Sequence, residues 1–183
     1  MNSELEELYQ SVILDHSKRP RNFGEIGEGA VQVRGDNPSC GDEIDLSVKF
    51  GAEGAVEDVK FKGLGCAISQ ASASLMTMKL KGKSEADARE MLRAFHDLVT
   101  TEVAEPARML GDLRLLAGVR KFPQRVKCAM LGWRAFEQAL ERKAGEGSVS
   151  TEEDDAPLAR SVPSSPTAVI LNGVPGGFAT GTE

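Results

Sequence analysis

The chain has 183 residues, and 40% of them are hydrophobic, which is sufficient for one domain of ordinary size with a packed core. The net charge of −6 and the aromatic content of 5% argue against nucleic-acid binding, which normally uses a basic surface and often aromatic stacking. No apolar run approaches the roughly 18–20 residues of a bilayer span, and the acidic start shows no secretory signal. We therefore expect a cytoplasmic protein with neither membrane nor nucleic-acid partners.

The first half of the chain predicts one helix followed by a small sheet. Apolar residues recur at helical spacing over residues 3–17, and the basic stretch 18–24, which is broken by Gly and Pro, ends this helix. His16 lies on the apolar face, which favours a packing role over a metal-ligand role. β-Branched and alternating apolar residues then predict three antiparallel strands with one wet face, over residues 31–34, 43–50 and 56–62, with 51–54 as a hairpin loop.

Helical spacing returns in the second half of the chain. A helix rich in small residues is predicted over residues 66–81, and Ser84 can cap the next helix. Pro106 suits the first turn of a short helix, residues 112–117 predict another, and Pro123 can open the last helix. The predicted fold is therefore α+β, with a small three-stranded antiparallel sheet packed against several helices.

The composition changes after residue 143. Of the 40 residues from 144 to 183, 19 are Gly, Pro, Ser or Thr, and residues 145–183 carry six acids against one Arg. Such a segment buries too little apolar surface to offset the entropy lost on ordering it. The predicted organisation is one domain over residues 1–143, followed by a low-complexity, disordered tail over residues 144–183.

Three cysteines, Cys40, Cys66 and Cys128, are the candidates for chemistry. Their odd number and the expected reducing compartment argue against a disulfide framework. Cys40 and Asp42 flank Gly41 in a loop between predicted strands, so both side chains can approach one point. Cys66 follows a Gly-rich turn at a predicted helix N-terminus, where the helix dipole favours thiolate over thiol. Cys128 lies in the second turn of the last predicted helix.

Three thiolates and one carboxylate form a four-coordinate set that suits Zn²⁺. Such a site carries excess negative charge, which Arg125 and Lys127 can relieve, unless both are solvated charges at the start of a helix. The spacing contains no C-x-x-C pair, and each cysteine alone is compatible with a small buried apolar residue. Asp42 is compatible with a turn residue that bonds its own backbone. From these residues alone, the metal site and its alternatives stay open.

Several stretches of the chain resemble the U-type iron–sulfur cluster scaffold family, and within it the SufU branch. The motif Asn-Pro-Ser-Cys-Gly-Asp at 37–42 carries the first cysteine. Lys127 occupies the position where IscU-like members have a His, and residues 121–125 stand where those members have a Leu-Pro-Pro-Val-Lys motif. The resemblance covers residues 5 to about 142, and its matching stretches are 8–16 with 20–22, 37–42, 61–69 with 71–74, and 121–129.

The resemblance implies that one zinc ion is held by four side chains and that one of them, Cys40, accepts sulfur. The sulfur donor would be the persulfide of a SufS-type, PLP-dependent cysteine desulfurase, and the recipient a SufBCD-type scaffold, which makes the protein a zinc-dependent sulfurtransferase. Arg125 is the candidate for charge support. Two alternatives stay open: a scaffold that assembles a [2Fe–2S] cluster on the same ligands, and an adaptor domain with structural zinc. The implied metal ligands are Cys40, Asp42, Cys66 and Cys128.

Overall fold

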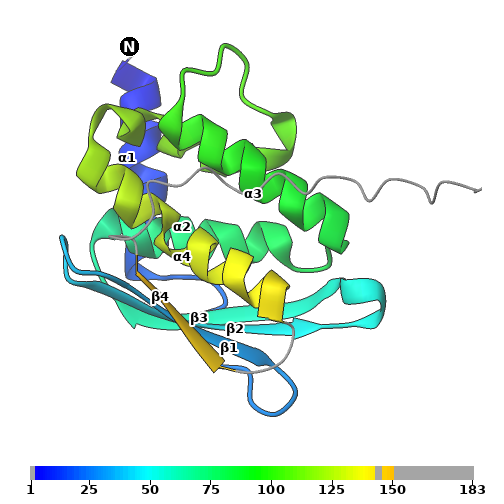
Figure 1. The fold of residues 1–183 in the computed structure, drawn as a ribbon. Coiled ribbons are helices and arrows are strands. Elements are labelled where there is room, and N and C mark those ends of the chain that lie inside the picture. Colours follow the sequence, from blue (N-terminus) through cyan, green and yellow to red (C-terminus); the bar gives the residue numbers. More distant parts are fainter. Residues whose placement is uncertain (1–2, 143–145, 151–183) are drawn as a thin grey trace, which may run out of the picture.

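The computed structural model describes residues 3–142 and 146–150, which form a sheet covered on one face by helices (Figure 1). The strands are hydrogen-bonded in the order β3-β2-β1-β4. Helices α2 and α4 lie next to the sheet, and α3 packs on α4 farther from it. The elements in chain order are α1 (Ser3–Lys18), β1 (Val31–Asn37), β2 (Asp42–Phe50), η1 (Ala52–Gly54), β3 (Val56–Leu64), α2 (Ala67–Leu80), α3 (Glu85–Thr100), η2 (Arg108–Lys121), α4 (Pro123–Arg142) and β4 (Glu146–Ser150).

Strands β1, β2 and β3 form the antiparallel sheet that the sequence predicts, and this prediction is confirmed. The last pair between β1 and β2 is Asn37 with Asp42, and Glu43 of β2 pairs with Leu64 at the end of β3. This register brings the end of β1, the start of β2 and the end of β3 to one corner of the sheet. The loop that carries Cys40 and the turn that leads to Cys66 both leave the sheet at this corner.

Strand β4 extends the sheet beyond the prediction. Its residues lie in the segment assigned above to a disordered tail, yet they pair in parallel with β1, from Gln32 with Glu146 to Asp36 with Ser150. The composition argument fails for these residues because strand pairing uses backbone groups, which β1 offers along its open edge. The remainder of the predicted tail, residues 144–145 and 151–183, lies outside the described residues.

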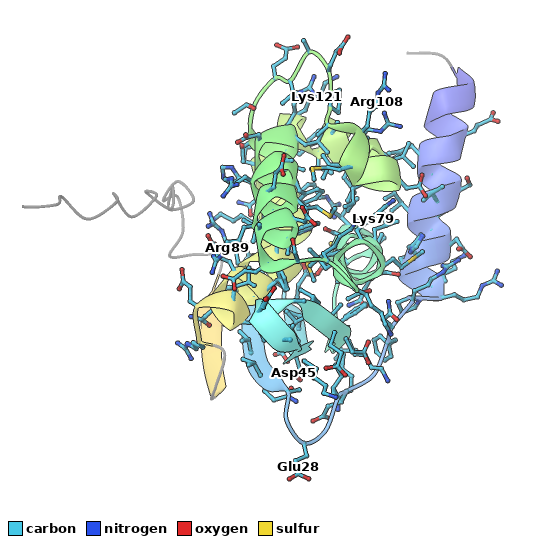
Figure 2. All side chains as sticks on the ribbon, turned by 90° about the vertical axis from the view of Figure 1, so that its right-hand side faces the viewer. Glu28, Asp45, Lys79, Arg89, Arg108 and Lys121 are labelled. Atoms are coloured by element: carbon cyan, nitrogen blue, oxygen red, sulfur yellow. The ribbon has the colours of Figure 1, made fainter. Side chains whose placement is uncertain are left out.

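Alternation along β2 explains why helices cover only one face of the sheet. Ile44, Leu46 and Val48 are buried beneath the helices. Asp45, between two of them, is exposed and lies within 3.8 Å of the Arg34 guanidinium. Figure 2 shows Asp45 on the face of the sheet away from the helices. One face is therefore apolar and the other carries charge pairs, as the predicted alternation requires.

Small residues let α2 and α4 pack closely against each other and the sheet. A Cβ on Gly132 of α4 would lie 3.4 Å from Ile44 Cδ1, so a larger side chain would crowd β2. Ser72 Oγ of α2 donates a hydrogen bond to a backbone carbonyl of α4 at 2.6 Å and accepts one from Trp133 Nε1 at 3.2 Å. The ring of Trp133 in turn stacks on Phe95 of α3, with centroids 4.5 Å apart. These contacts hold α4 in one position relative to the sheet.

The predicted roles of His16 and Ser84 are confirmed. His16 is buried, and its Nδ1 lies 2.7 Å from Ser74 Oγ of α2, so the residue ties α1 to the core. Ser84 caps α3, since its side chain accepts a hydrogen bond from the Asp87 N–H at 3.1 Å.

The segment between α3 and α4 contains two short helical pieces, as the sequence predicts, and both are 3₁₀ helices. Together they make up η2, and the non-helical backbone of Gly111, with φ of +53°, separates them. Glycine adopts this left-handed conformation without the penalty of a side chain. No helix within residues 3–142 is both long enough and apolar enough to cross a bilayer.

Candidate metal centre

The turn between β1 and β2 presents Cys40. The Asn37 carbonyl oxygen accepts hydrogen bonds from the N–H groups of Cys40 at 3.2 Å and Gly41 at 2.9 Å, which closes a tight turn after β1. Gly41 has φ of +69°, a conformation that favours glycine. The turn leaves Cys40 exposed, whereas Asp42, the first residue of β2, is 1% exposed.

The turn between β3 and α2 presents Cys66, and Asp42 holds it in place. Asp42 Oδ1 accepts a hydrogen bond from the Cys66 N–H at 2.7 Å, and Asp42 Oδ2 lies 3.6 Å from Cys66 Sγ. Gly65 allows this approach, because a Cβ there would lie 2.8 Å from Asp42 Oδ1. Cys66 is also the N-cap of α2, and its Sγ accepts a hydrogen bond from the Ser69 N–H at 3.5 Å. A helix N-terminus stabilises negative charge on such a sulfur.

The third cysteine reaches the site from α4. Cys128 is fully buried, and its Sγ lies 3.1 Å from Cys40 Sγ, although the two residues are 88 positions apart. Ligand atoms of Cys40, Asp42 and Cys128 all lie within 4.8 Å of one another. Cys66 adjoins this group through its contact with Asp42. The structure therefore brings the four side chains selected from the sequence to one place, here called the cysteine cluster.

The thiols of Cys66 and Cys128 differ in acidity because they share a hydrogen bond. The pKa of Cys66 is lowered to about 6, chiefly because the Cys128 thiol donates to it, although burial opposes this shift. The pKa of Cys128 is raised, chiefly by the same hydrogen bond and then by burial. The metal-free cluster thus favours one thiolate beside one thiol. Thiolate is the ligand form of cysteine, so metal binding at this cluster should release a proton.

The chemistry of the donors fits a divalent metal. Three sulfur atoms and one carboxylate oxygen are ligands that tetrahedral Zn²⁺ accepts, and thiolates also suit iron–sulfur clusters. Two of the donors, Asp42 and Cys128, are almost completely removed from water. A hydrogen-bond donor, Asn37 Nδ2, lies 3.5 Å from Cys128 Sγ, as is usual around metal-bound ligands. Zinc and iron are both compatible with this set.

Arg125, selected for charge support, lies exposed in the first turn of α4. Its backbone N–H donates to the carbonyl of Phe122 at 2.8 Å. Burial raises the pKa of Tyr9 on α1, and the positive charge of Arg125 partly offsets this shift. The charge of the Arg125 guanidinium therefore acts on Tyr9 of α1. Its support of the cysteine cluster stays a prediction.

Asn37 and Gly65 belong to the site, but the sequence predicts only a tight turn for Gly65 and no role for Asn37 beyond its place in the motif at 37–42. Asn37 is fully buried against Cys128, and Gly65 makes room for Asp42. The signal that could have indicated both is their position beside a motif cysteine, three residues before Cys40 and one before Cys66.

The fold and the cluster define a class of small α+β proteins with three cysteines and one aspartate at a corner of the sheet. The profile of the NifU-like N terminal domain matches residues 8–142, and the chain belongs to this family of U-type iron–sulfur cluster scaffold proteins. The resemblance seen in the sequence is therefore confirmed. The match ends at the last residue of α4 and does not include β4.

Individual relatives carry two kinds of name. The zinc-dependent sulfurtransferase SufU of Bacillus subtilis (strain 168) is 44% identical over 144 residues, which cover 79% of this chain and 97% of the relative. The iron–sulfur cluster assembly scaffold protein IscU of Streptococcus pyogenes serotype M1 is 45% identical over 142 residues, which cover 78% and 88%. A crystal structure of a SUF-system scaffold protein from Fervidobacterium islandicum AW-1 matches with a TM-score of 0.66 and 37% identity, covering 73% of this chain and 97% of that one.

Proposed function

We propose that this chain is a zinc-dependent sulfurtransferase of SUF-type iron–sulfur cluster assembly. Cys40 accepts persulfide sulfur from a SufS-type, PLP-dependent cysteine desulfurase, and the sulfur then passes to a SufBCD-type scaffold. The observation that carries the proposal is the difference in exposure within the cluster, since Cys40 is exposed on a turn while Cys128 is buried on a helix. The name of the B. subtilis relative supports the choice of metal and reaction.

The transfer requires a nucleophile that can reach a partner. The Cys40 thiolate attacks the outer sulfur of the donor persulfide, the donor S–S bond breaks, and the donor cysteine leaves as a thiolate, so that Cys40 carries the persulfide. Cys66, Cys128 and Asp42 are held by two helices and a strand and would retain zinc during this exchange. Zinc, when bound, supplies the positive charge that keeps cysteine sulfur deprotonated.

A second candidate function is a scaffold that assembles a [2Fe–2S] cluster on the same side chains. The 45% identity to the S. pyogenes protein, which is named a scaffold, favours this function, and thiolates are the usual cluster ligands. Lys127 weighs against it, because the IscU-like pattern has a His at this position. Elemental analysis separates the two functions: stoichiometric zinc without iron supports sulfur transfer, and a coloured iron–sulfide species supports the scaffold. If the protein is instead an adaptor with structural zinc, removal of the zinc should unfold it without the loss of any sulfur-transfer step.

The experiment that tests the proposal is transfer of radiolabelled sulfur from cysteine, through a SufS-type desulfurase, onto this chain. The wild-type chain should carry the label on Cys40, and Cys40→Ser should carry none. Cys66→Ser removes a thiol from the same cluster but keeps the acceptor, so it serves as the matched control and should retain part of the label. Equal labelling of the wild type and Cys40→Ser would refute the assignment of Cys40.

A further inference from the structure

Asn37, the last residue of β1, is completely buried beside the cysteine cluster. Its Nδ2 donates a hydrogen bond to Cys128 Sγ at 3.5 Å. Its Oδ1 is also buried, and it has no hydrogen-bond partner among the residues that the structure describes. A buried acceptor without a partner destabilises a fold. Packing alone therefore does not explain why an amide occupies this position.

The orientation of the amide indicates which group it serves. Once metal binding has removed the proton of Cys128, its thiolate accepts hydrogen bonds and donates none, so the NH₂ group is the end of the amide that suits it. Exchanging the two ends would turn Oδ1 toward the sulfur of Cys128, where a thiolate offers it no donor. Asn37 thus directs its donor at the cluster and leaves its oxygen unsatisfied.

The backbone of Asn37 serves a second cysteine. Its carbonyl oxygen accepts the N–H groups of Cys40 and Gly41, which form the turn that presents Cys40. These bonds do not depend on the side chain. A substitution that keeps the backbone of residue 37 therefore tests the contact with Cys128 separately from the turn.

We propose that Asn37 is a positioning residue that supports the Cys128 thiolate as a metal ligand through its N–H···S hydrogen bond. This inference rests on the proposed metal site and adds to it the residue that supports the buried ligand. Hydrogen-bond partners of metal ligands typically contribute about 10- to 100-fold to metal affinity. The loss of this bond should therefore weaken zinc binding without disturbing the turn at Cys40.

Asn37→Leu removes the donor and the unsatisfied oxygen while keeping a side chain of similar size. Zinc affinity, measured by competition with a chromophoric chelator, should fall about 10- to 100-fold. The melting temperature of the metal-free protein should stay the same or rise, because an unsatisfied buried oxygen is lost. In the Co²⁺-substituted protein, the sulfur-to-cobalt charge-transfer bands should shift to lower energy, since the sulfur lone pair is no longer stabilised. A purely structural role predicts a lower melting temperature with unchanged zinc affinity.

Ser47→Ala is the matched control. Ser47 is 1% exposed in the same sheet, and its hydroxyl donates to Gln32 Oε1 at 2.7 Å rather than to a cysteine. This variant should keep the wild-type zinc affinity and cobalt spectrum. Asn37→Ser, which withdraws the donor by shortening the side chain, should lose affinity like Asn37→Leu and provides a second variant.

Three outcomes are informative in different ways. Asn37→Leu with wild-type zinc affinity and an unshifted cobalt spectrum overturns the inference about Asn37. Failure of both Asn37 variants to fold shows a structural role and overturns it as well. A wild-type chain that binds neither zinc nor cobalt overturns the proposed metal site itself, so the two failures are distinguishable.

Discussion

The contact between Gly65 and the Asp42 carboxylate predicts the effect of Gly65→Ala. A Cβ at residue 65 would lie 2.8 Å from Asp42 Oδ1 and 3.1 Å from Asp42 Cβ, so the aspartate side chain would have to move. Asp42 Oδ1 accepts the hydrogen bond of the Cys66 N–H at 2.7 Å. Because Asp42 is 1% exposed, little water is available to replace the lost bond.

The expected magnitude follows from the nature of this bond. A hydrogen bond to a charged group contributes about 1.5–3 kcal/mol, and a buried donor left without a partner carries a comparable cost. We therefore expect Gly65→Ala to lower the free energy of unfolding of the metal-free protein by about 2–3 kcal/mol. Zinc affinity should fall at the same time, because Asp42 is displaced from the cluster.

Urea titrations followed by the fluorescence of the buried Trp133 measure this change. Gly118→Ala in η2 is the matched control, since a Cβ there meets no atom within 4 Å and the residue has no positive φ. The control should be neutral or stabilised by about 0.4–1 kcal/mol. Equal stabilities and equal zinc affinities for the two variants would refute the argument that Gly65 makes room for Asp42.

Three perturbations outside the cluster test the remainder of the fold. Burial lowers the pKa of His16 from 6.5, so this residue binds fewer protons in the folded protein than in the unfolded chain. The resulting contribution to the free energy of unfolding is fully present above pH 6.5 and is lost as the pH falls through the folded pKa. His16→Gln should flatten this part of the stability profile in urea titrations, and an unchanged profile would contradict the assignment. Ser72→Ala leaves Trp133 Nε1 buried without its acceptor and should lower stability by about 1–3 kcal/mol in thermal unfolding, whereas an unchanged melting temperature would speak against this contact. Ending the chain at Arg142 removes β4 and should speed hydrogen exchange of β1 amides but not of β3 amides; identical exchange in both chains would contradict the pairing.

The elements that can be predicted from the sequence are those in which side chains repeat with a period. The alternation of β2 and the cap at Ser84 are local properties, and the structure has both. β4 lacks such a signal, because its pairing depends on the open edge of β1, a distant segment. The shape of η2 depends on one backbone angle at Gly111, which composition and periodicity do not report.

The sequence predicts which residues form the cluster but not how these residues contact one another. The types of residue and the family resemblance selected the four side chains. The 3.1 Å contact of Cys128 with Cys40 depends on how closely α4 packs, and that packing depends on small residues such as Gly132. The hydrogen bond from Asn37 joins residues 91 positions apart, a separation at which no local pattern is informative.

The three thiols differ in how much structure must move with each of them. Cys128 is fully buried on α4, so its displacement would disturb the helical core. Cys66 caps α2 and is bonded to Asp42 through its N–H, so its displacement would open a helix end. Cys40 lies exposed on a turn. Among the described residues, this turn is closed by two backbone hydrogen bonds to the Asn37 carbonyl, and each contributes about 0.5–1.5 kcal/mol to stability. Cys40 is therefore the thiol that can leave the cluster at least cost, which is the physical reason for proposing it as the sulfur acceptor.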